Sequence, residues 1–183
     1  MNLVAIIQQL RLHCPALSGN VAGAAEFHAA VEDEAYLPLP AAYVIPLDDD
    51  DGPNENQTGL FQRGTERFGV IVVFDNATDL VNDRRGQAAT SNYGPMKLAL
   101  RAALLNWIPP PIPGDVVRSA RGLYAAGGEL VSADRARLFY QWVFALDVQF
   151  TGADGFQATF DSLEQVDATT TTGVEALILV PQY

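Results

Sequence analysis

Residues 138–150 read LFYQWVFALDVQF, and this stretch decides the fold class. Every second position from Leu138 to Phe150 carries a large apolar side chain, and polar side chains occur only at the positions between them. Successive side chains of a β-strand point to opposite faces of a sheet. The alternation therefore predicts one long strand with a large apolar face, which other elements must cover.

Further strands are expected on both sides of this stretch. The continuous apolar run FGVIVVF, residues 68–74, predicts a strand over 65–74 that is buried on both faces. Residues 40–47, PAAYVIPL, predict a strand that prolines confine to an edge or a strand end. We expect a hairpin from 116–124 and 129–131 around Gly127-Gly128. Residues 174–180 predict a last strand, which pairs with this chain or with a neighbouring subunit.

Three helices are expected. Apolar side chains at Leu3, Ile6, Ile7 and Leu10 have the spacing of an amphipathic helix, with Asn2 as its N-cap and Pro15 as its stop. The alanine-rich residues 21–31 predict a short helix around 24–32. Residues 85–107 predict the main helix, which Gly94-Pro95 delays or kinks and the prolines at 109–111 terminate.

The order of these elements predicts a single α+β domain. Its sheet is mostly antiparallel, and the long helix and the N-terminal helix pack on it. We place this domain at residues 1–150. Residues 151–183 form an acidic, threonine- and glycine-rich C-terminal extension that ends in an apolar strand. A total of 183 residues suits one domain with such an appendage.

The net charge of −11 argues against two classes of partner. Proteins that read nucleic-acid grooves and proteins that bind anionic membranes usually present basic surfaces. No apolar run has the length of a membrane span, and residues 1–15 lack the pattern of a secretory leader. The single cysteine, Cys14, cannot form an intramolecular disulfide. We therefore expect a soluble protein that is intracellular when made.

The charge is distributed unevenly along the chain. Residues 1–62 carry nine acids and one base, residues 63–137 carry ten bases and seven acids, and residues 138–183 carry six acids and no base. The three net charges are −8, +3 and −6. Complementary regions favour association between copies of the chain. Alternatively, they neutralise each other on one solvated surface.

The run Asp48–Asp51 is the strongest candidate for a metal site, but its spacing does not fit an EF-hand. With Gly52 at the sixth position of such a loop, Leu47 and Thr58 fall at positions that require oxygen ligands with charge. We therefore expect a solvated polar loop over residues 48–57 rather than a bound metal. His13 and His28 share no ligand spacing with each other or with Cys14. Cys14 is expected to be a small buried hydrophobic residue.

No catalytic motif is present. The sequence lacks a G-x-S-x-G elbow, a G-x-G-x-x-G loop and a G-x-x-x-x-G-K-[ST] loop. We therefore expect no enzymatic activity, no cofactor and no bound metal. Ten of the eleven basic residues are arginines, which protein interfaces favour over lysine because the guanidinium pairs with carboxylates in two places. GC-rich coding explains the same bias equally well.

In sequence order, several segments together resemble the tail terminator (tail completion) proteins of long-tailed bacteriophages. The likeness covers roughly residues 1–150 and rests on segment order and hydrophobic pattern. The segments are the helix 3–12 followed by Cys14-Pro15, and then 21–27, 39–47, 66–73, 85–107 and 134–141.

The resemblance implies a structural virion protein at the tail–neck junction that is made in the host cytoplasm. Members of the family form a hexameric ring on the last ring of the tail tube, stop its growth and present a surface to the neck. The implied partners are other copies of the chain, the tail tube protein, the neck or head–tail connector protein and, in contractile tails, the sheath protein. Genomic DNA would cross the lumen without specific binding, and no membrane is involved.

Two sets of residues are the candidates for this role. Arg63, Arg67, Arg84 and Arg85 are expected at an interface with another subunit or with a partner. Some of Asp48, Asp49, Asp50 and Asp51 are expected to face the lumen or a rim. An acidic or neutral wall suits the lumen because a basic lining would hold the DNA. A neck or head–tail joining protein of the same virion is the alternative function, and a small hydrolase or ligand-binding domain is a third.

Overall fold

A computed structural model describes residues 1–31, 37–75, 87–112, 119, 121–133, 137–156, 166–167 and 178–179. Six strands form one sheet. They are β1 (Val21–Ala22), β2 (Ala41–Pro46), β3 (Asp50–Asn54), β4 (Phe61–Asp75), β5 (Tyr124–Ala133) and β6 (Arg137–Thr151). The order across the sheet is β1-β2-β4-β6-β5, and β3 pairs with β4. Only β1 and β2 are parallel neighbours, so the predicted mostly antiparallel sheet is confirmed.

The long alternating stretch forms the predicted strand, β6, which lies between β4 and β5. All fifteen of its residues pair with all fifteen residues of β4, from Phe61 opposite Thr151 to Asp75 opposite Arg137. β2 and β3 share the other edge of β4. β2 pairs with residues 68–73, and β3 pairs with residues 62–65. β4 is thus held by neighbours on both edges.

Three helices accompany the sheet, as predicted. They are α1 (Leu3–His13), α2 (Ala24–Val31) and α3 (Gln87–Leu104). The backbone amide of Ala5 donates to Oδ1 of Asn2 at 3.1 Å, which makes Asn2 the predicted N-cap of α1. The helix α3 continues through Pro95 and ends at Leu104. Two single-turn helices, η1 (Pro15–Leu17) and η2 (Gly152–Asp154), complete the described helical elements.

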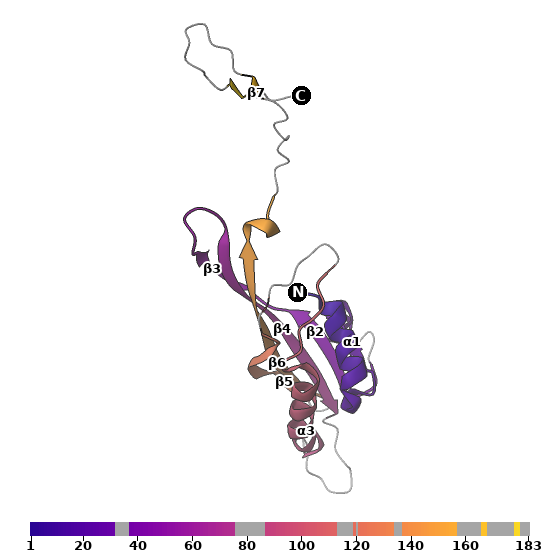
Figure 1. Cartoon of the computed structure of the whole chain (residues 1–183). Helices are drawn as coiled ribbons and strands as arrows, with labels where there is room; N and C mark the ends of the chain where they lie inside the picture. The colour runs from indigo at the N-terminus through magenta and orange to yellow at the C-terminus, as the bar shows by residue number, and fades with distance from the viewer. Residues whose placement is uncertain are drawn as a thin grey trace, which may run out of the picture.

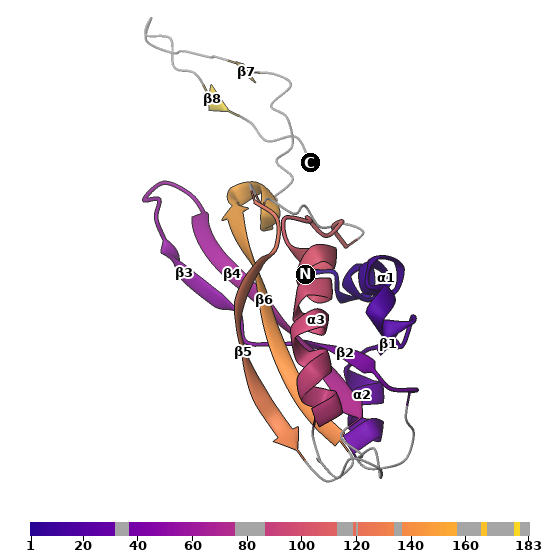
Figure 2. The same cartoon turned by 90° about the horizontal axis from the view of Figure 1, so that it is seen from below.

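The helices α1 and α3 lie side by side on one face of the sheet (Figures 1 and 2). This face carries the apolar stripe of β6 together with alternate residues of β4, and the main core forms here. Phe68 and Phe144 stack there with ring centroids 5.7 Å apart. The buried members include Ile6, Leu10, Val70, Val72, Phe74, Leu100, Leu104, Trp142, Phe144 and Leu146.

The opposite face of the sheet has a smaller core under α2. Ala41, Tyr43, Ile71, Val73 and Phe139 form it, and Phe27 of α2 contacts the ring of Tyr43 at a centroid distance of 5.5 Å. Residues 68–74 are therefore buried on both faces, as predicted. Farther along β4 and β6, the side chains on this second face become polar.

Two predictions about strands are wrong. The glycines Gly127 and Gly128 do not turn the chain, because β5 runs through both of them. Register shifts interrupt its pairing with β6 between Ala125 and Gly127 and between Leu130 and Ser132. Gly127 has φ +142°, so the glycines accommodate a bulge rather than a reversal. Residues 116–118 and 120 of the predicted hairpin lie outside the described residues.

The second wrong prediction concerns residues 48–57, which were expected to form a polar loop. Residues 50–54 form β3, although Asp-Asp-Gly-Pro-Asn has a low intrinsic preference for strands. Pairing with β4 overrides that preference. Of the predicted strand at 174–180, Ile178–Leu179 is described as β8, and it pairs with β7 (Val166–Asp167) of the same chain.

Candidate functional site

The most prominent surface feature is a hairpin that projects beyond the helices. We call residues 48–67 the arm. It consists of β3, the connection 55–60 and the first half of β4, and Figure 1 shows it extending away from α1 and α3. Most of its side chains are exposed, including those of Asp48, Asp49 and Asp51. The arm thus presents a run of carboxylates on an element that stands apart from the core.

One side chain, that of Asn54, organises the tip of the arm. Its Nδ2 donates to the carbonyls of Asn56 at 3.0 Å and Gly59 at 2.9 Å. Its Oδ1 accepts from the backbone amides of Asn56 at 3.2 Å and Phe61 at 2.9 Å. Asparagine supplies both kinds of hydrogen-bonding group on a short side chain and closes turns in this way.

We expect Asn54→Ala to loosen the tip of the arm without unfolding the domain. The replacement removes all four hydrogen bonds, but the tip is exposed and far from the core, so its amides exchange through local opening. Hydrogen exchange at the Phe61 amide should become faster, while the thermal midpoint stays near that of the wild type. Thr58→Ala is the matched control at the same tip. A large drop in midpoint would contradict this description.

The arm brings together two groups of residues that the sequence analysis listed separately. The backbone amide of Arg67 donates to Oδ1 of Asp49 at 3.2 Å, and its guanidinium lies 3.5 Å from Oδ2 of Asp50. Arg63 lies 3.9 Å from the carboxylate of Glu55, and its guanidinium is 5.6 Å from the ring centroid of Phe61. The side chain of Arg63 is 68% exposed. Exposed pairs of this kind contribute little to stability, so both arginines are available to another surface.

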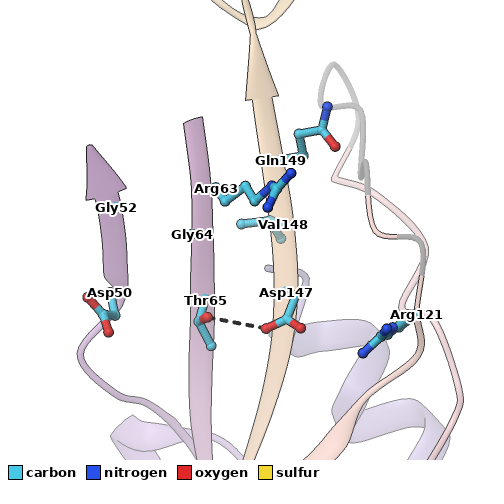
Figure 3. Close-up of a pocket in the computed structure, with 9 residues that line it drawn as sticks. All are labelled: Asp50, Gly52, Arg63, Gly64, Thr65, Arg121, Asp147, Val148 and Gln149. Carbon is cyan, nitrogen blue, oxygen red and sulfur yellow. Dashed lines mark hydrogen bonds between the residues drawn. The ribbon is translucent and has the colours of Figure 1, made fainter. Parts of the chain in front are cut away.

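A cavity of about 560 Å³ lies at the base of the arm. Figure 3 shows side chains from β3, β4 and β6 around it. The lining residues are Asp50, Gly52, Arg63, Gly64, Thr65, Arg121, Asp147, Val148 and Gln149.

Asp147 is the centre of the hydrogen bonding in this cavity. Its Oδ1 accepts from the hydroxyl of Thr65 at 3.2 Å and from the hydroxyl of Tyr124 at 2.8 Å. Burial, and then the hydrogen bond to this carboxylate, raise the pKa of Tyr124, which keeps the phenol a neutral donor. The contacts join β4, β5 and β6 across the sheet. The side chains of Thr65, Tyr124 and Asp147 are thus engaged with one another.

The predicted interface residues Arg84 and Arg85 lie outside the described residues. Among the ranges that the structure describes, no three His, Cys, Asp or Glu residues converge in a way that could hold a metal ion. In the same ranges, no helix is long and apolar enough to cross a membrane.

Cys14 is fully buried in the main core, between α1 and η1. Burial raises the pKa of its thiol, so the reactive thiolate is disfavoured. We expect Cys14 to react with a thiol reagent such as DTNB only as fast as the domain opens, and to react at once in denaturant. The time course of absorbance measures both rates. A rapid reaction of the folded protein would show instead that the thiol is accessible.

Sequence reasoning missed the organising residues Asn54 and Asp147. For Asp147 a signal existed, because it is the only charged residue within the alternating stretch 138–150. A carboxylate there is expected to lie on an open part of the sheet. For Asn54 no signal was available, since its partners depend on a hairpin that the sequence does not indicate.

The sequence and structure were compared with known proteins. A family model described as "Phage tail terminator protein" matches residues 1–154. No curated protein matches the chain. A chain of the solved structure titled "Virion of native gene transfer agent (GTA) particle" is similar at 21% sequence identity, with a TM-score of 0.49, over 81% of this chain and 95% of that chain.

Proposed function

We propose that this chain, which belongs to the phage tail terminator protein family and is a structural protein of the virion tail, forms a ring that caps the tail tube. The match of the family model to residues 1–154 is the observation that carries the proposal. The ring is a homohexamer on the last ring of the tube, it stops tube growth and it presents the joining surface for the neck. Its role is structural, without catalysis.

The proposed position is the tail–neck junction of the virion, after synthesis in the host cytoplasm. The partners are the tail tube protein, the neck or head–tail connector protein and, if the tail is contractile, the sheath protein. Residues 1–150 form the ring-building domain, and 151–183 are an extension to it. A ring of identical subunits needs a contact between two different surfaces that closes on itself.

The arm is the surface that best fits these contacts. It projects from the domain (Figure 1), and it carries both exposed arginines and exposed carboxylates. We assign Arg63 and Arg67, together with Arg84 and Arg85, to a contact with another subunit or a partner. Some of Asp48–Asp51 face the lumen or a rim, where negative charge keeps DNA from adhering.

The mass of the assembled protein tests the proposal. Size-exclusion chromatography with light scattering should give about six subunits, either alone or after addition of purified tail tubes, and electron microscopy should show rings at one end of each tube. Tubes incubated with the protein should stop elongating. A protein that stays monomeric with tubes and leaves their growth unchanged would contradict the proposal.

Charge variants then test the assigned residues. Arg63→Glu with Arg67→Glu should weaken assembly or capping, and the lysine replacements at the same positions serve as controls that keep the charge. Arg84→Glu with Arg85→Glu is a separate variant with the same expectation. If a glutamate variant assembles normally, the arginines that it replaces do not lie at the interface. An image of the ring with arginines rather than aspartates along the bore would refute the lumen assignment.

A further inference from the structure

A second pocket lies between α3 and the β5–β6 pair, on the face of the sheet that holds the main core. We call it the α3–β5 pocket. Its volume is about 260 Å³, and its lining includes Tyr93, Lys97, Arg101, Gly128, Tyr140 and Trp142. The side chains with polar atoms are two cations, two phenols and an indole. The side chains that line this pocket therefore offer more hydrogen-bond donors than acceptors.

Trp142 contributes a donor with no acceptor. The residue is 4% exposed, and its Nε1 is buried without a hydrogen-bond partner. A Cβ placed on Gly128 would lie 3.3 Å from Cδ1 of Trp142. Since Cδ1 is bonded to Nε1, the pyrrole edge of the indole lies beside Gly128, at the lining of the pocket. Buried donors in folded proteins almost always have an acceptor, and none of the described residues supplies one to Nε1 of Trp142.

Lys97 and Arg101 stand four residues apart on α3, and both line the pocket. Like charges at this spacing repel each other. Nζ of Lys97 lies 5.9 Å from the ring centroid of Tyr93, and within the described residues neither cation is paired with a carboxylate. Both arm arginines, in contrast, have acidic neighbours. Among the described residues, no ion pair therefore balances the positive charge of the pocket.

The other titratable groups nearby do not supply the missing acceptor. A hydrogen bond with Tyr93, and then burial, raise the pKa of Tyr140, which therefore stays a neutral phenol. Glu129 pairs in register with Gln141, whereas Gly128 pairs with Trp142. Because neighbouring residues of a strand point to opposite faces, Glu129 projects from the face of the sheet opposite to Trp142.

We propose that the α3–β5 pocket binds a carboxylate of the arm of a second copy of this chain. The pocket offers cations and an indole donor, and an anionic acceptor satisfies both. The arm carries five carboxylates within residues 48–55 and no base in that range. Asp48 and Asp51 are exposed, and within the described part of the chain they form no ion pair. The charges of the two surfaces are therefore complementary.

The topology makes this contact intermolecular. β3 lies on the edge of β4 opposite to β6, and β5 lies beyond β6. Within the arm, β3 is held by its pairing with β4, and the first half of β4 is held by its pairing with β6. The arm therefore cannot fold over the sheet into its own pocket. A contact of the arm with the pocket joins two different surfaces, as ring closure requires. This inference rests on the proposed ring and names the contact that builds it.

A charge exchange tests the contact. The pocket variant carries Lys97→Glu and Arg101→Glu, and the arm variant carries Asp48→Lys and Asp51→Lys. Each variant alone places like charges together and should fail to form rings at concentrations at which the wild type assembles. An equimolar mixture should restore rings of alternating subunits, because the introduced lysines then meet the introduced glutamates and the unaltered arm meets the unaltered pocket. Circular dichroism and thermal melting verify that both variants fold.

Two results of this experiment would overturn the proposal while the proposed function stands. They are rings formed by either variant alone and failure of the mixture to assemble. If the pocket variant forms rings that no longer cap tubes, the pocket receives a carboxylate of another virion protein. A wild type that neither assembles nor caps tubes contradicts the proposed function itself.

If the wild type is monomeric in isolation, its pocket is vacant and a peptide of residues 47–62 is the probe. Addition of the peptide to the full chain should shift the indole Nε1–H resonance of Trp142 in a ¹⁵N correlation spectrum, while that of Trp107 stays in place. The same peptide with asparagine at residues 48–51 should bind at least tenfold more weakly. Trp142→Phe, which removes the donor and keeps an aromatic ring, should also weaken binding. Equal affinity for both peptides would overturn the inference.

Discussion

Replacing Phe68 with alanine is expected to lower the free energy of unfolding by about 3–5 kcal/mol, the cost typical of truncating a buried phenylalanine. Phe68 is completely buried in β4 and stacks on Phe144 of β6 with ring centroids 5.7 Å apart. The backbone there is paired on both edges, so the sheet cannot collapse into the space that the ring leaves. The thermal midpoint should fall by roughly 10 °C.

Phe156→Ala is the matched control, because it deletes the same atoms from a side chain that is 94% exposed. Its stability should stay within about 0.5 kcal/mol of the wild type. Urea unfolding followed by circular dichroism measures both variants. Equal stability of the two would mean that Phe68 does not pack in the core between β4 and β6.

Gly122→Ala is expected to destabilise the domain by about 2–3 kcal/mol, as overpacking does. A Cβ at Gly122 would meet the backbone of Asn106, with its Cα at 2.5 Å and its carbonyl closer still. The backbone amide of Asn106 donates to the carbonyl of Leu123, and that of Leu123 donates to the carbonyl of Trp107, both at 2.9 Å. These two hydrogen bonds join the end of α3 to the start of β5, and a methyl group would separate the segments.

The control for this position is Gly152→Ala, since a Cβ there would have nothing within 4 Å. Chemical denaturation should show little change for Gly152→Ala and a lowered midpoint for Gly122→Ala. The hydrogen exchange of the Leu123 amide should also become faster in the Gly122 variant. A Gly122 variant as stable as the wild type would mean that the two segments are not in close contact.

The elements that the sequence predicted best are those whose side chains follow a strict period. The stripe of β6 and the doubly buried run of β4 could be found without knowing what lies next to them. The strand β3 could not be predicted in this way, because its residues disfavour strands. Only the pairing with β4 holds them in a strand conformation. Likewise, Gly127 and Gly128 look like a turn in isolation. Their strand conformation depends on the paired β6.

For the candidate site, the sequence identified types of residue but not their arrangement. Arg67 and Asp50 were separate candidates, and only the hairpin brings them to 3.5 Å. The α3–β5 pocket was not predicted because its groups come from three elements. The indole of Trp142, in particular, reads as one more apolar member of a stripe. An unpaired donor becomes visible only when the atoms around it are known.

The pairing of β4 with β6 has a mechanical consequence. Fifteen residue pairs at about 3.4 Å per residue extend over roughly 50 Å. A pull on the tip of the arm acts along β4, parallel to the strand, and loads this ladder in shear. The hydrogen bonds on both edges of the strand then share the tension, whereas a peeling load would break them one after another. The arm therefore transmits force into the core of the domain and does not unravel from its tip.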